Sequence, residues 1–216
     1  MKKERNIFMT NQLTSLKDDK TKTIADYKFF YLGPLLFKIK LNPQDLKKCA
    51  KLCNKKESTV NEMLAGLIKH EHRVNHHVFH RILEPYVVSF RRAYRQWYGN
   101  MLMTPMTMQL AWVNFMRAGE FNPPHIHTNC DFSSVLFVKI PEKLKEEHKK
   151  FVGTSGGPGA ISFLYGESRA HTITHKDFLP EEGDFFMFPG NLTHYVFPFL
   201  CAGERISMSA NFSLKV

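Results

Sequence analysis

The arrangement of apolar and polar residues divides the chain near residue 100 into two halves with different patterns. Before that point, apolar residues recur every three or four positions in long stretches; after it, short apolar runs alternate with turns that contain glycine and proline. The first spacing is typical of helices that bury one face, and the second of strands. The chain is therefore predicted to have a helical first half and a strand-rich second half.

Three helices are predicted in the first half. The first begins at Asn42, because asparagine is a good N-cap and Pro43 fits the first helical turn. A second is expected from Val60 to about Glu71, and a third from about His76 to Trp97, whose apolar residues share one face. Proline removes a backbone donor, so the third helix is expected to break or bend near Pro85.

Short strands are predicted on both sides of these helices. Residues 27–41 indicate one or two strands interrupted at Gly33-Pro34, residues 143–150 a charged helix or loop, and residues 153–159 a glycine-rich turn. Many short strands joined by turns are typical of a sandwich or barrel. The other predicted strands are Leu110–Met116, Val135–Ile140, Ala160–Tyr165, Asp184–Phe188, Tyr195–Phe199 and Arg205–Leu214.

Size and composition are those of an ordinary globular protein. The 216 residues suffice for one domain with a core, and 43% are hydrophobic and 23% charged. No apolar run reaches the roughly 18 residues needed to span a bilayer. The first 20 residues are polar and lack the apolar region of a secretory signal. The four cysteines form no close pairs of the kind that structural zinc sites use, so free thiols in a cytoplasmic protein are expected.

The net charge of +10 raises the question of an acidic partner. The lysines are scattered along the chain and form no basic stripe interleaved with aromatic residues. Nucleic-acid binding is therefore not indicated, and a solvated basic surface is the favoured interpretation.

Three histidines lie where predicted strands begin or end. His125 and His127 follow the strand Leu110–Met116 and are separated by one residue, so an extended backbone would turn both to the same side. His194 follows a Pro-Gly turn at the start of another strand. Neutral imidazole is a common metal ligand. The pattern predicts one metal ion held by His125, His127 and His194.

Arginine and serine two residues apart, at Arg205 and Ser207, share a face of the last predicted strand. An iron site that activates O2 keeps open positions, which a chelating keto acid can fill. The far carboxylate of such an acid needs a cationic fork, and arginine with a hydroxyl supplies one. Asn114 is a further candidate to bind the keto acid, although a strand residue satisfied by backbone is an alternative interpretation.

The order of these motifs resembles the 2-oxoglutarate/Fe(II)-dependent oxygenase superfamily. The segments NPPHIHTNCDFSSVLFVKIP, GDFFMFPGNLTHYVFPF and ERISMSANF are similar to a group of partly phage-borne oxygenases, and LAGLIKHEH at residues 64–72 extends the likeness upstream. The resemblance implies a double-stranded β-helix (jelly-roll or cupin-like) over residues 104–216. Residues 26–103 would be a helical support segment and residues 1–25 a flexible lead, in one compact domain overall.

The same resemblance implies the activity. His125 and His194 would bind Fe(II), while Arg205 and Ser207 would bind the C5 carboxylate of 2-oxoglutarate. The enzyme would be a dioxygenase that uses O2 to hydroxylate a C–H bond and releases succinate and CO2. No catalytic residue beyond the metal site is implied. The substrate is left open between a protein side chain and a small molecule.

One departure from the family pattern leaves alternatives. The superfamily usually has H-x-D or H-x-E, whereas this chain has His127 in the third position. The third ligand could be His127, Asp131 or water, and the one-residue spacing favours His127. Two other functions stay open: a cupin-like metalloprotein with a three-histidine site that does not use 2-oxoglutarate, and a non-catalytic binding module.

Overall fold

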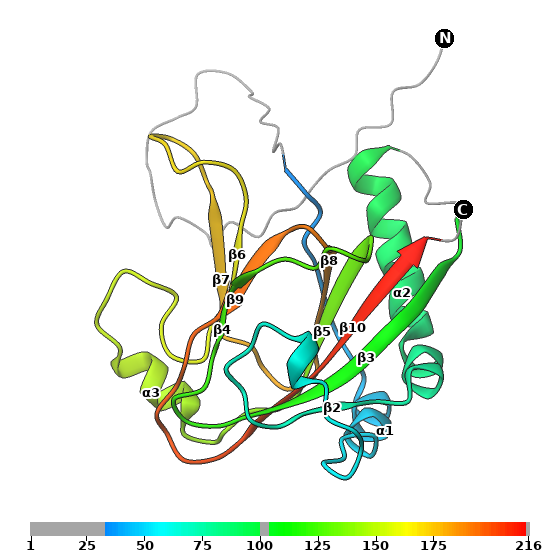
Figure 1. Ribbon diagram of the computed structural model, residues 1–216. Coiled ribbons are helices and arrows are strands. Elements are labelled where there is room, and N and C mark those ends of the chain that lie inside the picture. The colour runs from blue at the N-terminus through cyan, green and yellow to red at the C-terminus, as the bar shows by residue number, and fades with distance from the viewer. Residues whose placement is uncertain (1–32, 100–103, 215–216) are drawn as a thin grey trace. The chain divides into compact units, whose positions relative to one another are not determined.

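Two antiparallel sheets form most of the computed structural model, which describes residues 33–99 and 104–214 (Figure 1). The larger sheet has the strand order β1-β8-β5-β10-β3-β2, and the smaller has the order β4-β9-β6-β7. The strands are β1 (Phe37–Lys40), β2 (Glu71–Arg73), β3 (Met106–Met116), β4 (Asn122–His125), β5 (Phe132–Lys139), β6 (Ile161–Leu164), β7 (His175–Phe178), β8 (Asp184–Pro189), β9 (Thr193–Val196) and β10 (Arg205–Leu214). A mostly β fold with antiparallel sheets is confirmed.

Two of the predicted N-terminal helices are present. Helix α1 (Pro43–Ala50) begins after Asn42, whose side-chain Oδ1 accepts a hydrogen bond from the backbone N–H of Asp45 at 2.8 Å, as its N-cap role requires. Helix α2 (His76–Tyr98) is a single element of 23 residues. It runs through Pro85 without a break, so of the break or bend expected at this proline the break is absent. It ends at Gly99, whose φ of 74° is a left-handed conformation that glycine adopts readily.

The second predicted helix, from Val60 to about Glu71, is wrong. The chain forms only the 3-10 turn η1 (Asn61–Met63) and then enters β2. Backbone pairing replaces the helical hydrogen bonds: the N–H of Val60 donates to the carbonyl of Glu71, and the N–H of Leu67 donates to that of Phe121. Tertiary pairing therefore outweighs a local pattern of apolar residues, and the first half contributes strands as well as helices.

In the second half, the six predicted strands are found, five of them with shifted ends and Arg205–Leu214 with the predicted bounds. The charged stretch forms helix α3 (Leu144–Lys150), and residues 153–159 are a loop. Strands β2, β4 and β7 were not predicted, since β4 contains two prolines and β7 reads HKDF, and neither shows an apolar alternation.

Two apolar clusters fill the two sides of the larger sheet. One lies against α2, where Phe79, Leu83 and Phe90 pack with residues of β3 and β10. The other combines Phe137 and Phe186 of the larger sheet with residues of the smaller sheet. The larger sheet is thus covered by helix on one face and by the smaller sheet on the other, and the candidate site lies on the second face.

Residues 34–216 cluster as one compact unit. The division at residues 26–103 and 104–216 stays a prediction, and the lead of residues 1–25 lies outside the described part of the chain. None of the described helices is both long and apolar enough to cross a membrane.

Candidate functional site

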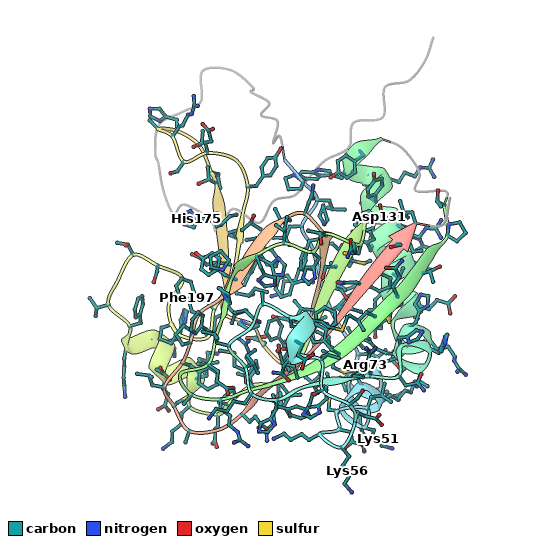
Figure 2. All side chains as sticks on the ribbon, viewed as in Figure 1. Lys51, Lys56, Arg73, Asp131, His175 and Phe197 are labelled. Carbon is teal, nitrogen blue, oxygen red and sulfur yellow. The ribbon has the colours of Figure 1, made fainter. Side chains whose placement is uncertain are left out.

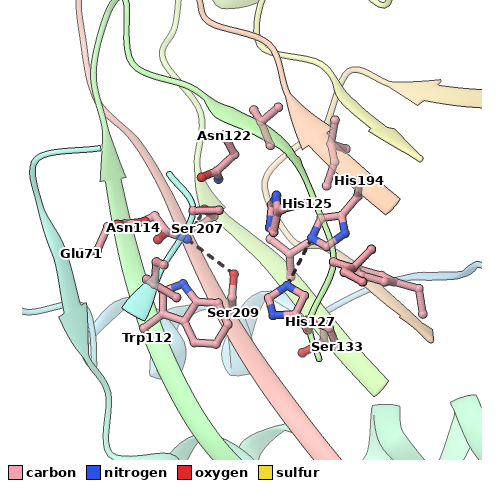
Figure 3. A pocket seen from close by; sticks show the side chains of 18 of the residues that line it. Glu71, Trp112, Asn114, Asn122, His125, His127, Ser133, His194, Ser207 and Ser209 are labelled. Carbon is pink, nitrogen blue, oxygen red and sulfur yellow. Dashed lines mark hydrogen bonds between the residues drawn. The ribbon is translucent and has the colours of Figure 1, made fainter. Parts of the chain in front are cut away.

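The three candidate histidines come together on the smaller sheet. His125 on β4 lies directly opposite His194 on β9 in the antiparallel register, and His127 follows two residues after β4 (Figure 3). One ring nitrogen from each lies within 4.8 Å of the others, and His127 Nε2 is 3.3 Å from His194 Nε2. Imidazole nitrogens that converge in this way can share one metal ion.

Backbone carbonyls fix the orientation of two of the rings. His125 Nδ1 donates to the carbonyl of Pro123 at 2.7 Å, and His194 Nδ1 donates to that of Leu192 at 2.9 Å. Each hydrogen bond places the proton on Nδ1, which leaves the Nε2 lone pair free for a metal. His127 lies against Trp112 with 5.9 Å between ring centroids.

The surroundings keep the imidazoles neutral. Burial lowers the pKa of His194 to about 3 and that of His127 to about 4, and it also lowers the pKa of His125. Neutral imidazole is the form that binds metals, so at neutral pH the three rings need not lose a proton first.

Asp131, the alternative third ligand, is engaged elsewhere. Its Oδ2 accepts a hydrogen bond from the backbone N–H of Leu214 at 2.7 Å, and its own N–H donates to the carbonyl of Phe212. Figure 2 shows Asp131 near the C-terminal end of β10. Within the described residues, the metal-ligand cluster contains the three histidines and no carboxylate. The structure therefore brings His127 to the cluster and leaves Asp131 at the end of β10.

Arg205 is a buried cation on the opposite sheet. Its side chain is 1% exposed, donates from Nη1 to the carbonyl of Gly159 at 3.2 Å, and lies 5.3 Å from the ring centroid of Phe137. Its Nε has no hydrogen-bond partner, and the ion pairs of the described residues include none with Arg205. Burial lowers its pKa to about 9. A buried guanidinium without an anion is costly, which indicates a site for an anionic ligand.

Ser207 and Asn114 continue the polar face beside Arg205. They are opposite each other in the register of β10 and β3, and Asn114 Nδ2 donates to Ser207 Oγ at 3.4 Å (Figure 3). Asn114 Oδ1 is buried and has no partner. Unsatisfied polar atoms inside a cavity are what a bound polar ligand would satisfy.

One cavity of about 160 Å³ is lined by all six predicted site residues. The converging imidazoles suit a metal, and the unpartnered atoms of Arg205 and Asn114 suit an anion with additional polar atoms. The donor set therefore fits a metal with a dicarboxylic keto acid.

Sequence reasoning missed Glu71, Asn122 and Ser209, which also line the cavity. Glu71 was assigned to the end of a helix, where its pairing with β3 could not be foreseen. The LAGLIKHEH likeness was the available signal, because it ends one residue beyond Glu71. Trp112, two residues before Asn114 on β3, lines the cavity as well.

The family model described as "Putative 2OG-Fe(II) oxygenase" matches residues 110–211, a span that contains all six predicted site residues. This match confirms the resemblance to the 2-oxoglutarate/Fe(II)-dependent oxygenase superfamily. The description of the matched family names Fe(II) and 2-oxoglutarate, the two cofactors predicted from the sequence, and so confirms that prediction. A search of curated proteins finds no match.

Solved structures share the fold at low identity. A prolyl-4-hydroxylase from Pseudomonas putida has a TM-score of 0.52 and 15% identity, over 84% of this chain and 93% of that one. A viral collagen prolyl hydroxylase from Paramecium Bursaria Chlorella virus-1 has a TM-score of 0.51 and 14% identity, over 82% and 94%. HygX from Streptomyces hygroscopicus, with nickel and 2-oxoglutarate bound, has a TM-score of 0.55 and 9% identity, over 83% of each chain.

Proposed function

We propose that this protein is an Fe(II)- and 2-oxoglutarate-dependent dioxygenase that hydroxylates a C–H bond and releases succinate and CO2. The observation that carries the proposal is the meeting of two features in one cavity. Three imidazoles converge on one side, and the buried Arg205 without an anion lies on the other.

His125, His127 and His194 would hold the iron. The Nδ1 hydrogen bonds of His125 and His194 and the neutral state of all three rings support this role, and His127 would replace the carboxylate that is usual in the superfamily. When bound, Fe(II) with 2-oxoglutarate supplies the activation of O2 that C–H oxidation needs.

Arg205 and Ser207 would bind the C5 carboxylate of 2-oxoglutarate, and Asn114 would donate to or accept from the same molecule. The unpartnered Nε of Arg205 and the hydroxyl of Ser207 would orient the acid. The apolar side chains of Met116, beside Arg205 in the register, and of Phe137 would exclude water from the ion pair and so strengthen it.

The architecture supports a double-stranded β-helix. The two antiparallel sheets face each other across an apolar cluster, and solved 2-oxoglutarate oxygenases align with TM-scores of 0.51 to 0.55. We assign the β-helix to residues 104–216 and the bracing role to residues 26–103, although β1 and β2 of that segment join the larger sheet.

The direct test is 2-oxoglutarate binding to the full chain loaded with Mn(II), which does not react with O2 as iron does. We expect binding by calorimetry in the wild type and at least about 100-fold weaker binding in Arg205→Met, because a charge-assisted pair is lost. Arg81→Met, which removes an exposed arginine of α2, is the matched control. Absence of 2-oxoglutarate binding in the Mn(II)-loaded wild type would overturn the proposal.

A second candidate is a cupin-like metalloprotein that does not use 2-oxoglutarate. The three-histidine cluster without a carboxylate among the described residues favours it. It predicts that Arg205→Met keeps the activity of the wild type, whereas the dioxygenase predicts that succinate formation from 2-oxoglutarate is lost.

The substrate is a separate question. The fold neighbours include a prolyl hydroxylase from Trichoplax adhaerens in complex with a peptide fragment and HygX with hygromycin B, so relatives of this fold accept both protein and small-molecule ligands. We propose O2 and one organic substrate as the co-substrates, and the cavity itself indicates the class of that substrate.

A further inference from the structure

A second buried charge lies in the same cavity, two strands away from the first. Glu71 is 1% exposed and lines the cavity from the edge strand β2, directly opposite Asn114 on β3. Asn114 is opposite Ser207 on β10, so a polar row crosses three strands (Figure 3). Arg205 belongs to the next row, beside Met116. The cavity therefore holds a carboxyl group and a guanidinium group on different strands.

Glu71 has no cationic partner within the described residues. The ion pairs found there do not include it, and its Oε2 accepts a hydrogen bond from Asn61 Nδ2 at 3.3 Å. Burial raises its pKa to about 7, and the negative charge of Glu120 adds to this effect. A carboxyl group kept in a cavity without a cation costs stability, as the guanidinium of Arg205 does.

A glycine lets the backbone pack closely against the side chains of Glu71 and Asn122. A Cβ at residue 66 would collide with Asn122 Oδ1 and would lie 3.1 Å from Glu71 Oε1, so glycine is needed there. Gly66 therefore lies against two acceptor oxygens, one from β2 and one from β4, and both of these residues line the cavity. Two acceptors from different strands match a ligand group with several donors, such as an ammonium or a guanidinium.

Apolar side chains also line the cavity. Met63 and Ile126, which are 62% and 46% exposed, line it together with Leu64. Arg205 is the one lysine or arginine among the described residues that line the cavity. A carbon chain could contact these apolar side chains while a charged tip reaches Glu71, in the way that lysine side chains bury their stems.

We propose that the substrate is an aliphatic compound with a cationic nitrogen, which Glu71 and Asn122 bind at the end of the cavity formed by the edge strand β2 and by β4. Its carbon chain contacts Met63, Leu64 and Ile126. This inference rests on the proposed function, because it names the substrate class of the same site. The overall charge of +10 does not oppose it, since salt screens exposed charges beyond about 8 Å and the cation meets a buried acid.

The test compares two probes of equal chain length, n-pentylammonium and n-pentanol, on the full chain, with and without Mn(II) and 2-oxoglutarate. Dissociation constants are measured by protein-observed NMR. We expect wild-type protein to bind pentylammonium about tenfold more tightly than pentanol, and this preference to disappear in Glu71→Gln. Glu62→Gln, which removes an exposed carboxylate of η1, should keep the preference.

The outcomes separate this inference from the proposed function. Equal affinities for the two probes, no binding of pentylammonium, or an unchanged preference in Glu71→Gln would overturn the inference. Binding of 2-oxoglutarate is measured in the same samples, and its loss in the wild type would overturn the proposed function instead. We expect Glu71→Gln to bind 2-oxoglutarate as the wild type does, because Arg205, Ser207 and Asn114 are unchanged and Glu71 lies two strands away from Arg205.

Discussion

The two faces of strand β10 are both buried, but they are built in opposite ways. Toward α2, the strand places Met208, Ala210 and Phe212 in an apolar cluster. Toward the cavity, it places Arg205 and Ser207, and the guanidinium keeps a nitrogen without a partner. Burial alone therefore does not mark the functional face. The mark is buried polarity that the protein leaves unsatisfied, which lowers stability unless a ligand supplies the missing partner.

The largest expected effect concerns the metal side of the cavity. Removing the imidazole of His194 in His194→Ala should weaken Mn(II) binding by more than about 100-fold, because one of three protein ligands is lost. The measurement is Mn(II) titration followed by electron paramagnetic resonance. His80→Ala is the matched control, since His80 contacts Phe212 on the α2 side of the sheet and should leave Mn(II) affinity unchanged. Equal losses in both variants would show that the two sides are not independent.

The second prediction concerns the apolar face, where a substitution should lower stability and leave ligand binding unchanged. Met208→Ala should lower the free energy of unfolding by about 2–5 kcal/mol, because a fully buried side chain leaves a cavity behind. The remaining folded protein should bind 2-oxoglutarate with wild-type affinity. Chemical denaturation and calorimetry on the same samples test this, and a matching loss of affinity would contradict the division between the faces.

Both faces of β10 follow from one sequence pattern, and this explains what could be predicted. The alternation of polar and apolar residues in RISMSANF predicts a strand, and it placed Arg205 and Ser207 on one side correctly. Asn114 and Trp112, two residues apart on β3, both line the cavity, as the alternation of a strand requires. Local periodicity was sufficient wherever the strand alternates.

Periodicity failed where pairing between distant segments decides the structure. Nothing local in residues 60–71 signals that Glu71 lies opposite Asn114, because that register depends on contacts of residues more than 40 positions apart. The approach of His125 to His194 was expected from motif order, but their direct pairing on β4 and β9 requires a strand that contains two prolines. Such elements cannot be derived from propensity.

The third prediction concerns the cavity face, where a substitution should leave stability equal or higher and abolish ligand binding. In Arg205→Met the buried cation is replaced by an apolar side chain of similar length, so the free energy of unfolding should stay equal or rise by about 1–4 kcal/mol. Binding of 2-oxoglutarate should be lost in the same variant. Denaturation without ligand measures the first quantity. A strong loss of stability would mean that the main role of Arg205 is to support the fold through its hydrogen bond to Gly159, and that binding a ligand is not its main role.

The fourth prediction concerns pH and the other buried charge. The folded state raises the pKa of Glu71 to about 7 from an ordinary value of 4.5, so it keeps a proton that the unfolded chain releases. The stability contribution of Glu71 is therefore present at low pH and is lost as the pH rises from about 4.5 to 7. Glu71→Gln should be more stable than the wild type by about 2–3 kcal/mol at pH 8, and nearly equal at pH 4. Denaturation of both proteins across this range measures the difference, and a difference independent of pH would contradict the buried, unpaired acid.

The smallest expected effect concerns Asp131. This residue follows His127 by four positions in the sequence, but its side chain forms a hydrogen bond with the end of β10. In Asp131→Asn the amide oxygen can still accept the hydrogen bond from the N–H of Leu214, so the free energy of unfolding should fall by only about 1 kcal/mol. Mn(II) affinity should stay within about twofold of the wild type, whereas His127→Ala should weaken it at least about tenfold. If the two variants gave the reverse order, Asp131 would be the third ligand in the metal-bound state. The segment after β4 would then have to release Leu214 and turn toward the cavity when the metal binds.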